Sequence, residues 1–294
     1  MLIFGLLALG LAGTPDTSLA LQAAARERIA RDSGAVVGVF LRDPVSGLAL
    51  ELNSRLRFHA ASTMKLGVLL ELGRRIDAKT LAWTDSVPIK NSFASIVDSS
   101  RYTLDPTSDS DSTVYAAVGT AWTVRQLATR MIVRSSNLAT NLLVERLGAE
   151  RITATIRSLG ADSMVVLRGV EDGKAYAKGL NNTTTARDLG LLLLAIAEGR
   201  AVSAPTGREL LAILEAQEFN DGIPAGLPAG RRVAHKTGEI SATWHDAALV
   251  YPPDGKPYTL VVLTRNVAER ARGIRLQADL ARIADAAVLA ARRQ

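Results

Sequence analysis

Apolar positions alternate at strand spacing near both ends of the chain and recur at helical spacing in between. Residues 35–53 read as two strands joined by the turn sequence DPVSG. Further strand patterns appear at 231–238, 245–253 and 258–266, whereas the region 122–200 is helical in pattern. The economical interpretation is an α+β fold. An antiparallel sheet is built from both chain ends and flanked by helices, and an all-helical region is inserted between its two halves.

Helical patterns also flank the strand segments. Residues 18–33 are amphipathic, the chain ends in one long helical pattern, and 62–76 form a helix with Ser62 as its cap or first-turn residue. The segment 84–121 is rich in Ser, Asp and Thr, so we expect it to be irregular and exposed. These patterns predict two domains, a sheet domain formed by residues 21–65 and 205–294, and a helical domain formed by residues 66–204.

The first thirteen residues, MLIFGLLALGLAG, form a short apolar run. A membrane-spanning helix needs roughly 20 apolar residues, so this run is too short to be one. Small residues at Ser18 and Ala20 suit a signal peptidase, and we predict a signal peptide over residues 1–20 and a periplasmic or secreted protein. No Lys or Arg precedes the run, which leaves a mis-assigned start or a short buried helix as the alternative.

The formal net charge is +6, but the 35 basic residues are spread along the chain and none of them forms a run interleaved with aromatics. We therefore expect no nucleic-acid partner. We also expect a small-molecule substrate and a monomer. Attraction to an anionic cell-envelope surface stays open. Much of the excess lies near the C-terminus and is interpreted as the solvated face of the last helix: Arg265, Arg270, Arg272, Arg275, Arg282, Arg292 and Arg293.

Several kinds of site lack their sequence motifs. There is no cysteine, which excludes disulfides and thiolate metal sites. GxGxxG, P-loop, HExxH and GxSxG patterns are absent as well. The three histidines, His59, His235 and His245, are not paired at helical ligand spacing. We expect no metal and no cofactor.

The stretch FHAASTMK places Ser62 three residues before Lys65 where a helical pattern begins. A serine hydroxyl needs a base to become a nucleophile, and a lysine can serve if burial or nearby positive charge keeps part of it neutral. Residues at i and i+3 lie on one helix face, and the N–H of a first-turn serine is free to donate to an oxyanion. Taken alone, the pair is better interpreted as a helix cap followed by a surface lysine, and other stretches of the sequence are needed to favour catalysis.

Two further stretches carry polar groups at the ends of predicted elements. RSSN places Ser135 and Asn137 at the junction of two helical patterns, where side chains can point into a cleft. HKTGE places Lys236, Thr237 and Gly238 at the end of a predicted strand. A lysine and a hydroxyl there can hold a substrate carboxylate, and glycine lets a ligand approach the backbone. Read separately, these stretches are a cap and a turn.

Taken in chain order, S-x-x-K, S-x-N and K-T-G resemble the three signature motifs of class A β-lactamases and penicillin-binding proteins. The similarity runs from about residue 20 to the C-terminus. It includes TTTARDL, similar to the helix start after the family's omega loop, and HDAALVYPPDGKPYTLVVLTRN, similar to its closing hairpin. The resemblance implies a β-lactamase/D,D-peptidase-like fold with an omega-like loop at about 165–184.

The resemblance also implies a role for each motif residue. Ser62 would be acylated, Lys65 would act as base or proton relay, and Ser135 would pass a proton to the leaving nitrogen. The backbone N–H groups of Ser62 and Glu239 would form the oxyanion hole. The residues implied to bind substrate are Asn137 for the side-chain amide, and Lys236 and Thr237 for the carboxylate, with Gly238 beside them.

The omega loop departs from the family's pattern. β-Lactamases carry a glutamate there, with an asparagine four residues later, and the glutamate positions the deacylating water. Glu171 is the candidate, but Ala175 stands four residues after it. Asn181 and Asn182 are open as substitutes, and Glu171 or Asp172 can also be read as a plain loop charge.

Three other positions differ from the family. Ser136 stands where the second motif usually has aspartate, which affects support of the loop more than the chemistry. Trp244 lies near the place where the family commonly supplies an arginine for the substrate carboxylate. Glu239 adds negative charge beside a site expected to bind an anion, which would weaken binding or favour zwitterionic substrates.

The first functional hypothesis is an exported serine hydrolase that opens β-lactams through an acyl-Ser62 intermediate, with Glu171 activating the deacylating water. A second is a D,D-peptidase or esterase on peptidoglycan-like substrates, which uses the same acylation residues without the glutamate. A third is a penicillin-binding or sensing protein that is acylated and then turns over slowly.

Overall fold

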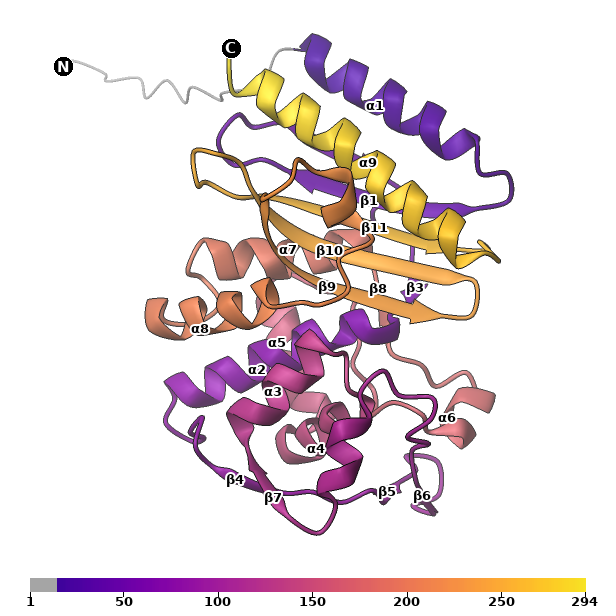
Figure 1. Cartoon of the computed structure of the whole chain (residues 1–294), viewed down its shortest axis with the longest axis vertical. Helices are drawn as coiled ribbons and strands as arrows, with labels where there is room; N and C mark the ends of the chain where they lie inside the picture. Colours follow the sequence, from indigo (N-terminus) through magenta and orange to yellow (C-terminus); the bar gives the residue numbers. More distant parts are fainter. Residues whose placement is uncertain (1–14) are drawn as a thin grey trace, which may run out of the picture.

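The computed structural model describes residues 15–294, so most of the expected signal segment 1–20 lies outside the described residues. A five-stranded antiparallel sheet separates two sets of helices (Figure 1). Its strand order is β2-β1-β11-β10-β9, which places strands from the two ends of the chain side by side. The strands are β1 (Val36–Arg42), β2 (Ala49–Leu52), β9 (Arg232–Ile240), β10 (Thr243–Tyr251) and β11 (Tyr258–Arg265). The predicted sheet from both chain ends is confirmed.

Strand β1 shows why the sheet is buried on both faces. Its residues alternate between two hydrophobic clusters, with Phe40 in one and Val39 and Leu41 in the other. Helix α7 (Ala186–Ala197) crosses the face that Phe40 occupies. A Cβ on Gly190 would lie 2.2 Å from the Phe40 ring, so this glycine lets α7 pack close to the sheet.

Helices α1 (Pro15–Ala30) and α9 (Arg270–Ala291) cover the opposite face of the sheet (Figure 1). The C-terminal end of α9 is held to the β1–β2 turn, because Arg292 donates to Asp43 at 2.6 Å and 3.0 Å. The Arg292 side chain is only 7% exposed. The interpretation of the terminal arginines as a solvated face is therefore wrong for Arg292.

The inserted region packs around helix α2 (Lys65–Asp77), whose first nine residues are all buried. This region lies beyond α7 on the far side from α9 (Figure 1). The helices that surround α2 are α3 (Val124–Val133), α4 (Asn137–Leu147), α5 (Ala149–Ser158) and α8 (Ala204–Glu215). The 3₁₀ helix η1 (Ala61–Met64) leads directly into α2 and brings that helix to the edge of the sheet beside β9.

The segment 84–121 is largely irregular, as predicted, but parts of it are buried rather than exposed. Ser95, Asp109 and Asp111 are all at most 9% exposed. Its short elements are β4 (Ser86–Pro88), β5 (Phe93–Ala94), β6 (Arg101–Tyr102), η2 (Ser112–Ala117) and β7 (Ala121–Thr123). The remaining short elements are β3 (Phe58–His59), α6 (Gly173–Ala177), β8 (Thr183–Thr184) and η3 (Ile223–Gly226).

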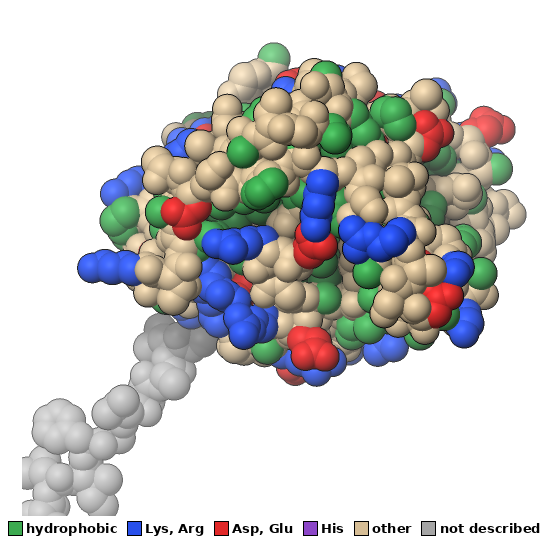
Figure 2. Space-filling model, turned by 90° about the horizontal axis from the view of Figure 1, so that it is seen from below, with side chains coloured by type: hydrophobic (Ala, Val, Ile, Leu, Met, Phe, Trp, Pro, Cys, Tyr) green, Lys and Arg blue, Asp and Glu red, His purple; other side chains and the backbone are tan. Residues whose placement is uncertain are grey.

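Basic side chains are spread over the face seen from below, several of them next to acidic ones (Figure 2). Many arginines of the described chain form ion pairs, for example Arg125 with Glu209 and Arg134 with Glu218. Within residues 15–294, no helix has both the length and the apolar character needed to cross a membrane.

Candidate active site

Ser62 lies in η1, directly after Ala61, whose backbone has a φ of 46°. The N–H of Ala61 donates to the His59 ring at 3.0 Å, which fixes this turn. Strand β9 approaches closely, because a Cβ on Gly238 would lie 3.1 Å from the Ser62 nitrogen and 3.0 Å from the Thr63 nitrogen. A side chain at position 238 would push the strand away from the serine, which explains why the K-T-G motif has a glycine there.

The free edge of β9 presents the backbone N–H of Glu239 beside the backbone N–H of Ser62. Glu239 is paired with Trp244 on β10. Both the N–H and the C=O of Trp244 are bonded to Thr264 on β11, so they point away from β9. In an antiparallel ladder the partner of such a residue also points its groups outward. The N–H of Glu239 therefore faces the edge where Ser62 lies, as an oxyanion hole requires.

Lys65 is the first residue of α2 and is 0% exposed. Its Nζ donates to Ser135 O at 2.5 Å, to Asn137 Oδ1 at 2.9 Å and to Ser135 Oγ at 3.2 Å. Burial lowers the pKa of Lys65 to about 7, against the opposing charges of Asp109 and Glu171. A large share of this lysine is therefore neutral near pH 7 and able to accept a proton.

Ser135 joins the two motif lysines. It follows α3 with a φ of 56°, a left-handed conformation that a non-glycine residue adopts only where its surroundings hold it. Its Oγ lies 3.2 Å from Lys65 Nζ and 3.1 Å from Lys236 Nζ. Lys236 is also 0% exposed, and burial, with the charge of Lys65 added, lowers its pKa well below the usual value. This chain of three groups can carry a proton across the site.

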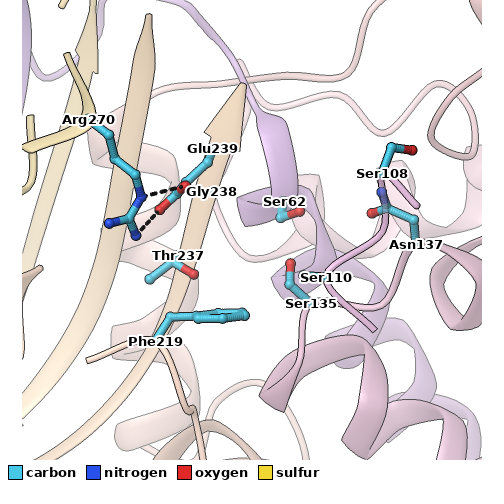
Figure 3. A pocket seen from close by; sticks show the side chains of 10 residues that line it. All are labelled: Ser62, Ser108, Ser110, Ser135, Asn137, Phe219, Thr237, Gly238, Glu239 and Arg270. Atoms are coloured by element: carbon cyan, nitrogen blue, oxygen red, sulfur yellow. Dashed lines mark hydrogen bonds and ion pairs between the residues drawn. The ribbon is translucent and has the colours of Figure 1, made fainter. Parts of the chain in front are cut away.

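Two cavities meet at Ser62, and both are also lined by Asn137 and Glu239. The first, of about 270 Å³, is bounded by Ser135 and Thr237 and continues to Arg270 (Figure 3). The second, of about 310 Å³, lies on the omega-loop side of Ser62 and is lined by His59, Arg168, Glu171 and Tyr176. A substrate attacked by Ser62 can therefore extend in both directions.

The structure separates the roles of the two neighbouring omega-loop carboxylates. Glu171 has a φ of 62° and its Oε1 accepts a hydrogen bond from Asn137 Nδ2 at 2.7 Å. Burial raises the pKa of Glu171, partly offset by that hydrogen bond. Asp172 also borders the second cavity, but its carboxylate accepts from Ser95 Oγ, from Ile96 N and from the Ala175 N–H that it caps. Glu171 faces the site and Asp172 holds the loop.

Asn181 and Asn182 were candidates for the asparagine that accompanies the omega-loop glutamate, but neither forms a hydrogen bond with Glu171. Asn181 accepts from Arg168 Nη2 at 3.0 Å, and Asn182 accepts from the backbone of Leu167 and Arg168. Both residues hold the end of the omega-like loop to its beginning at residues 167–168. Ala175, four residues after Glu171, is buried in α6. The side-chain amide beside Glu171 is that of Asn137, from the second motif.

Sequence reasoning missed several residues that line the two cavities, three of which lie on the wall of the first cavity. Arg270, expected on a solvated helix face, lines the first cavity and binds Glu239 through two hydrogen bonds (Figure 3). Ser108 and Ser110 come from the segment 84–121 and line the same cavity. Trp244 does not line it, and its indole N–H donates to Val267 O at 2.8 Å. The missed residues lack a local motif, so only the fold brings them to Ser62.

No three His, Asp or Glu side chains of residues 15–294 are grouped so that they could hold a metal ion. The site consists of a serine at the start of a buried helix, a buried lysine with a pKa near neutrality, and two backbone N–H groups beside the serine. On an α+β fold with this strand order, these features define a serine hydrolase.

Comparison with known proteins agrees with that class. The pattern of the β-lactamase enzyme family matches residues 20–288, so this chain belongs to the β-lactamase enzyme family. β-Lactamase AST-1 of Nocardia asteroides is 34% identical over 239 residues, which are 79% of this chain and 72% of that protein. The carbapenem-hydrolyzing β-lactamase KPC of Klebsiella oxytoca is 29% identical over 261 residues, covering 87% of this chain and 85% of that protein.

A solved structure shares the whole fold. A mutant of PBP-A, in an acyl-enzyme complex with penicillin G, matches this chain with a TM-score of 0.79 and 25% sequence identity. The match covers 92% of this chain and 97% of that one. The predicted β-lactamase/D,D-peptidase-like fold is confirmed.

Proposed function

We propose that the protein is a β-lactamase that hydrolyses β-lactams through an acyl-Ser62 intermediate. Membership of the β-lactamase enzyme family supports the class of reaction. The observation that carries the mechanism is the state of Lys65, which is fully buried, has a pKa of about 7, and begins the helix that η1 and Ser62 lead into.

In the acylation step, Ser62 Oγ bonds to the β-lactam carbonyl carbon while its proton passes to neutral Lys65. In the free protein Lys65 Nζ is bonded to Ser135 and Asn137 and makes no hydrogen bond to Ser62 Oγ within residues 15–294. Such contacts tighten when substrate is bound. The N–H groups of Ser62 and Glu239 stabilise the negative charge that develops on the carbonyl oxygen.

Collapse of the tetrahedral intermediate breaks the carbon–nitrogen bond of the ring. The leaving nitrogen takes the Ser135 hydroxyl proton, and Lys65 returns to Ser135 the proton received from Ser62. The distances from Ser135 Oγ to both lysines support this relay. Thr237 and Lys236 bind the substrate carboxylate, and Asn137 binds the side-chain amide.

Deacylation needs a base for water. Glu171 takes a proton from a water molecule whose oxygen bonds to the acyl carbon. The bond from that carbon to Ser62 Oγ then breaks, and Ser62 Oγ receives the proton that Glu171 gives up. The hydrogen bond from Asn137 and the placement of Glu171 on the second cavity support this role.

Turnover of a chromogenic cephalosporin tests the proposal. We expect many cycles per protein molecule and complete loss of turnover in Ser62→Ala. Unchanged turnover in that variant would exclude the mechanism. The same assay on Ser241→Ala, a serine in the β9–β10 turn, controls for the loss of a hydroxyl group near the site.

A second candidate function is a D,D-peptidase or esterase on peptidoglycan-like substrates, or a penicillin-binding protein with slow turnover. One observation favours it, since Ala175 leaves Glu171 without an asparagine on α6 to help hold a water. Intact-mass measurement after mixing with penicillin G separates the candidates. A persistent adduct indicates the binder or peptidase, and free enzyme with hydrolysed penicillin indicates the β-lactamase.

We also propose that the protein is exported to the periplasm or secreted, and that it acts as a monomer. The apolar leader with small residues at Ser18 and Ala20 supports export. Fractionation and N-terminal sequencing test this: recovery only from the cytoplasm would overturn export, and residues 1–20 kept on protein recovered outside the cytoplasm would overturn cleavage of the signal peptide.

A further inference from the structure

Asp109 is a carboxylate with four hydrogen-bond partners at the edge of the site. It lies in the segment 105–111 and is only 9% exposed. Its Oδ2 accepts the backbone N–H groups of Asn137 at 2.8 Å and Leu138 at 3.1 Å, and the Tyr115 hydroxyl at 2.9 Å. Its Oδ1 accepts the Asp111 N–H at 3.1 Å. One side chain therefore joins this segment to the first residues of α4.

The neighbours of Asp109 face the substrate cavity. Ser108 and Ser110, on either side of it in sequence, line the first cavity together with Asn137 (Figure 3). Asp109 itself turns inward to α4. It therefore sets the distance between this serine-bearing wall and the helix that carries Asn137.

The charge of Asp109 also acts on the catalytic groups. Its carboxylate is the first of the charges that oppose the lowering of the Lys65 pKa, and it adds to the raised pKa of Glu171. Two further charges act on these groups. The positive charges of Lys65 and Lys236 repel each other, and the negative charge of Asp105, in the same segment as Asp109, adds to the raised pKa of Tyr115. Burial, with the Asp109 charge added, raises the pKa of Tyr115, which keeps its hydroxyl protonated as a donor.

We propose that Asp109 is a positioning residue for the reaction of Ser62, because it fixes the N-terminus of α4 and with it the Asn137 side chain. The inference rests on the proposed acyl-serine function. Asn137 contacts Lys65 through Oδ1 and Glu171 through Nδ2, so a small shift of its backbone moves both contacts. Ser136 caps α4 only through the Ala139 N–H, which leaves the Asn137 and Leu138 N–H groups to Asp109.

Substitution Asp109→Asn tests this role, since an amide cannot accept at both of its terminal atoms. Because the substitution weakens the hydrogen bonds that fix Asn137, we expect acylation by penicillin G to slow by roughly 10- to 100-fold. We also expect the acidic limb of the acylation pH profile to move to lower pH. Removing a nearby negative charge lowers the Lys65 pKa, so the neutral form appears at lower pH.

Asp111→Asn is the matched control. Asp111 is also buried, at 2% exposed, and its carboxylate caps η2 through the Thr113 N–H and pairs with Arg130; among the described residues it accepts no hydrogen bond from α4. We expect this variant to lose stability and to keep the wild-type pH profile and acylation rate per folded molecule.

The outcomes separate the two proposals. Absence of both an adduct and penicillin hydrolysis with the wild-type protein would overturn the acyl-serine function itself. If Asp109→Asn is acylated as fast as the wild-type protein and with the same pH profile, only the positioning role is overturned. If Asp109→Asn does not fold, Asp109→Glu, which lengthens the side chain, and Tyr115→Phe, which removes one donor, carry the test. Both must slow acylation, and wild-type rates in the two variants would overturn the inference.

Discussion

The Arg270 guanidinium donates two parallel hydrogen bonds to the Glu239 carboxylate, at 2.8 Å and 3.0 Å, on the wall of the first cavity. Its remaining amino group donates to Asp221 at 2.7 Å. A bidentate pair of this kind holds both side chains in one geometry. Arg270 therefore compensates Glu239, but the three groups together still carry one net negative charge beside Thr237.

Glu239→Gln should improve the capture of β-lactams that carry a carboxylate. The change removes one negative charge and leaves Arg270 in an ion pair with Asp221 alone, while the backbone N–H of residue 239 stays in place. These side chains are partly exposed, so we expect a fall in KM of only about 3- to 10-fold, with kcat nearly unchanged. Steady-state kinetics with a penicillin measure the effect. Glu209→Gln, in the distant exposed pair with Arg125, is the control. A lower kcat at unchanged KM would contradict the prediction.

Acylation should depend on the protonation of Lys65. The neutral form is the base, and burial lowers its pKa to about 7, so the acylation rate should rise with pH through that value. Stopped-flow measurements of acylation from pH 5 to 9 would show an inflection near pH 7 if this is correct. Lys65→Ala should reduce the rate by about 10²- to 10⁴-fold, as expected for loss of a general base. A flat profile would show that another group is the base.

Glu171→Gln should allow acylation but slow release. The amide keeps the size of the side chain and loses the ability to take a proton from water. We expect an acyl-enzyme to accumulate with penicillin G, and deacylation to slow by roughly 10²- to 10⁴-fold. Intact-mass spectra over time measure the adduct, with Glu145→Gln on the outer side of α4 as a control. If Glu171→Gln accumulates no more adduct than wild type, Glu171 is not the deacylating base.

Arg292→Ala should destabilise the fold without altering the chemistry. The change leaves Asp43, which is 0% exposed, without its charged partner. Loss of one partner of a buried pair typically costs about 3–5 kcal/mol. Denaturant unfolding measures this, and Arg282→Ala in an exposed pair should have little effect. Equal stability of Arg292→Ala and wild type would show that the pair adds nothing to stability.

The pH dependence of that pair has a definite sign. Although burial acts to raise the pKa of Asp43, its hydrogen bonds to Arg292 and Ser46 hold the pKa below its ordinary value. The stabilisation is therefore present above the unfolded-state pKa of about 4 and is lost as the pH falls below it. Wild-type and Arg292→Ala proteins should converge in stability toward low pH.

Local pattern was enough for much of the fold. Strand β1 alternates between two hydrophobic clusters, and its apolar run reads as a buried strand without any knowledge of its neighbours. Short elements such as α6 are not predicted from the sequence, because five residues carry too little periodicity to be recognised. The expectation that the segment 84–121 is exposed is wrong for its buried residues, such as Asp109 and Asp111. Its polar residues are buried by accepting hydrogen bonds from distant partners, as Asp109 does from α4.

The sequence by itself determined the motif residues, because Ser62, Lys65, Ser135 and the K-T-G run each depend on residue type and short spacing. Tertiary structure decided the environment of those residues. The near-neutral pKa of Lys65 comes from complete burial, and the pairing of Arg270 with Glu239 joins residues 31 positions apart. Desolvation and long-range contacts arise only when distant segments pack together, so no local pattern of residues encodes them.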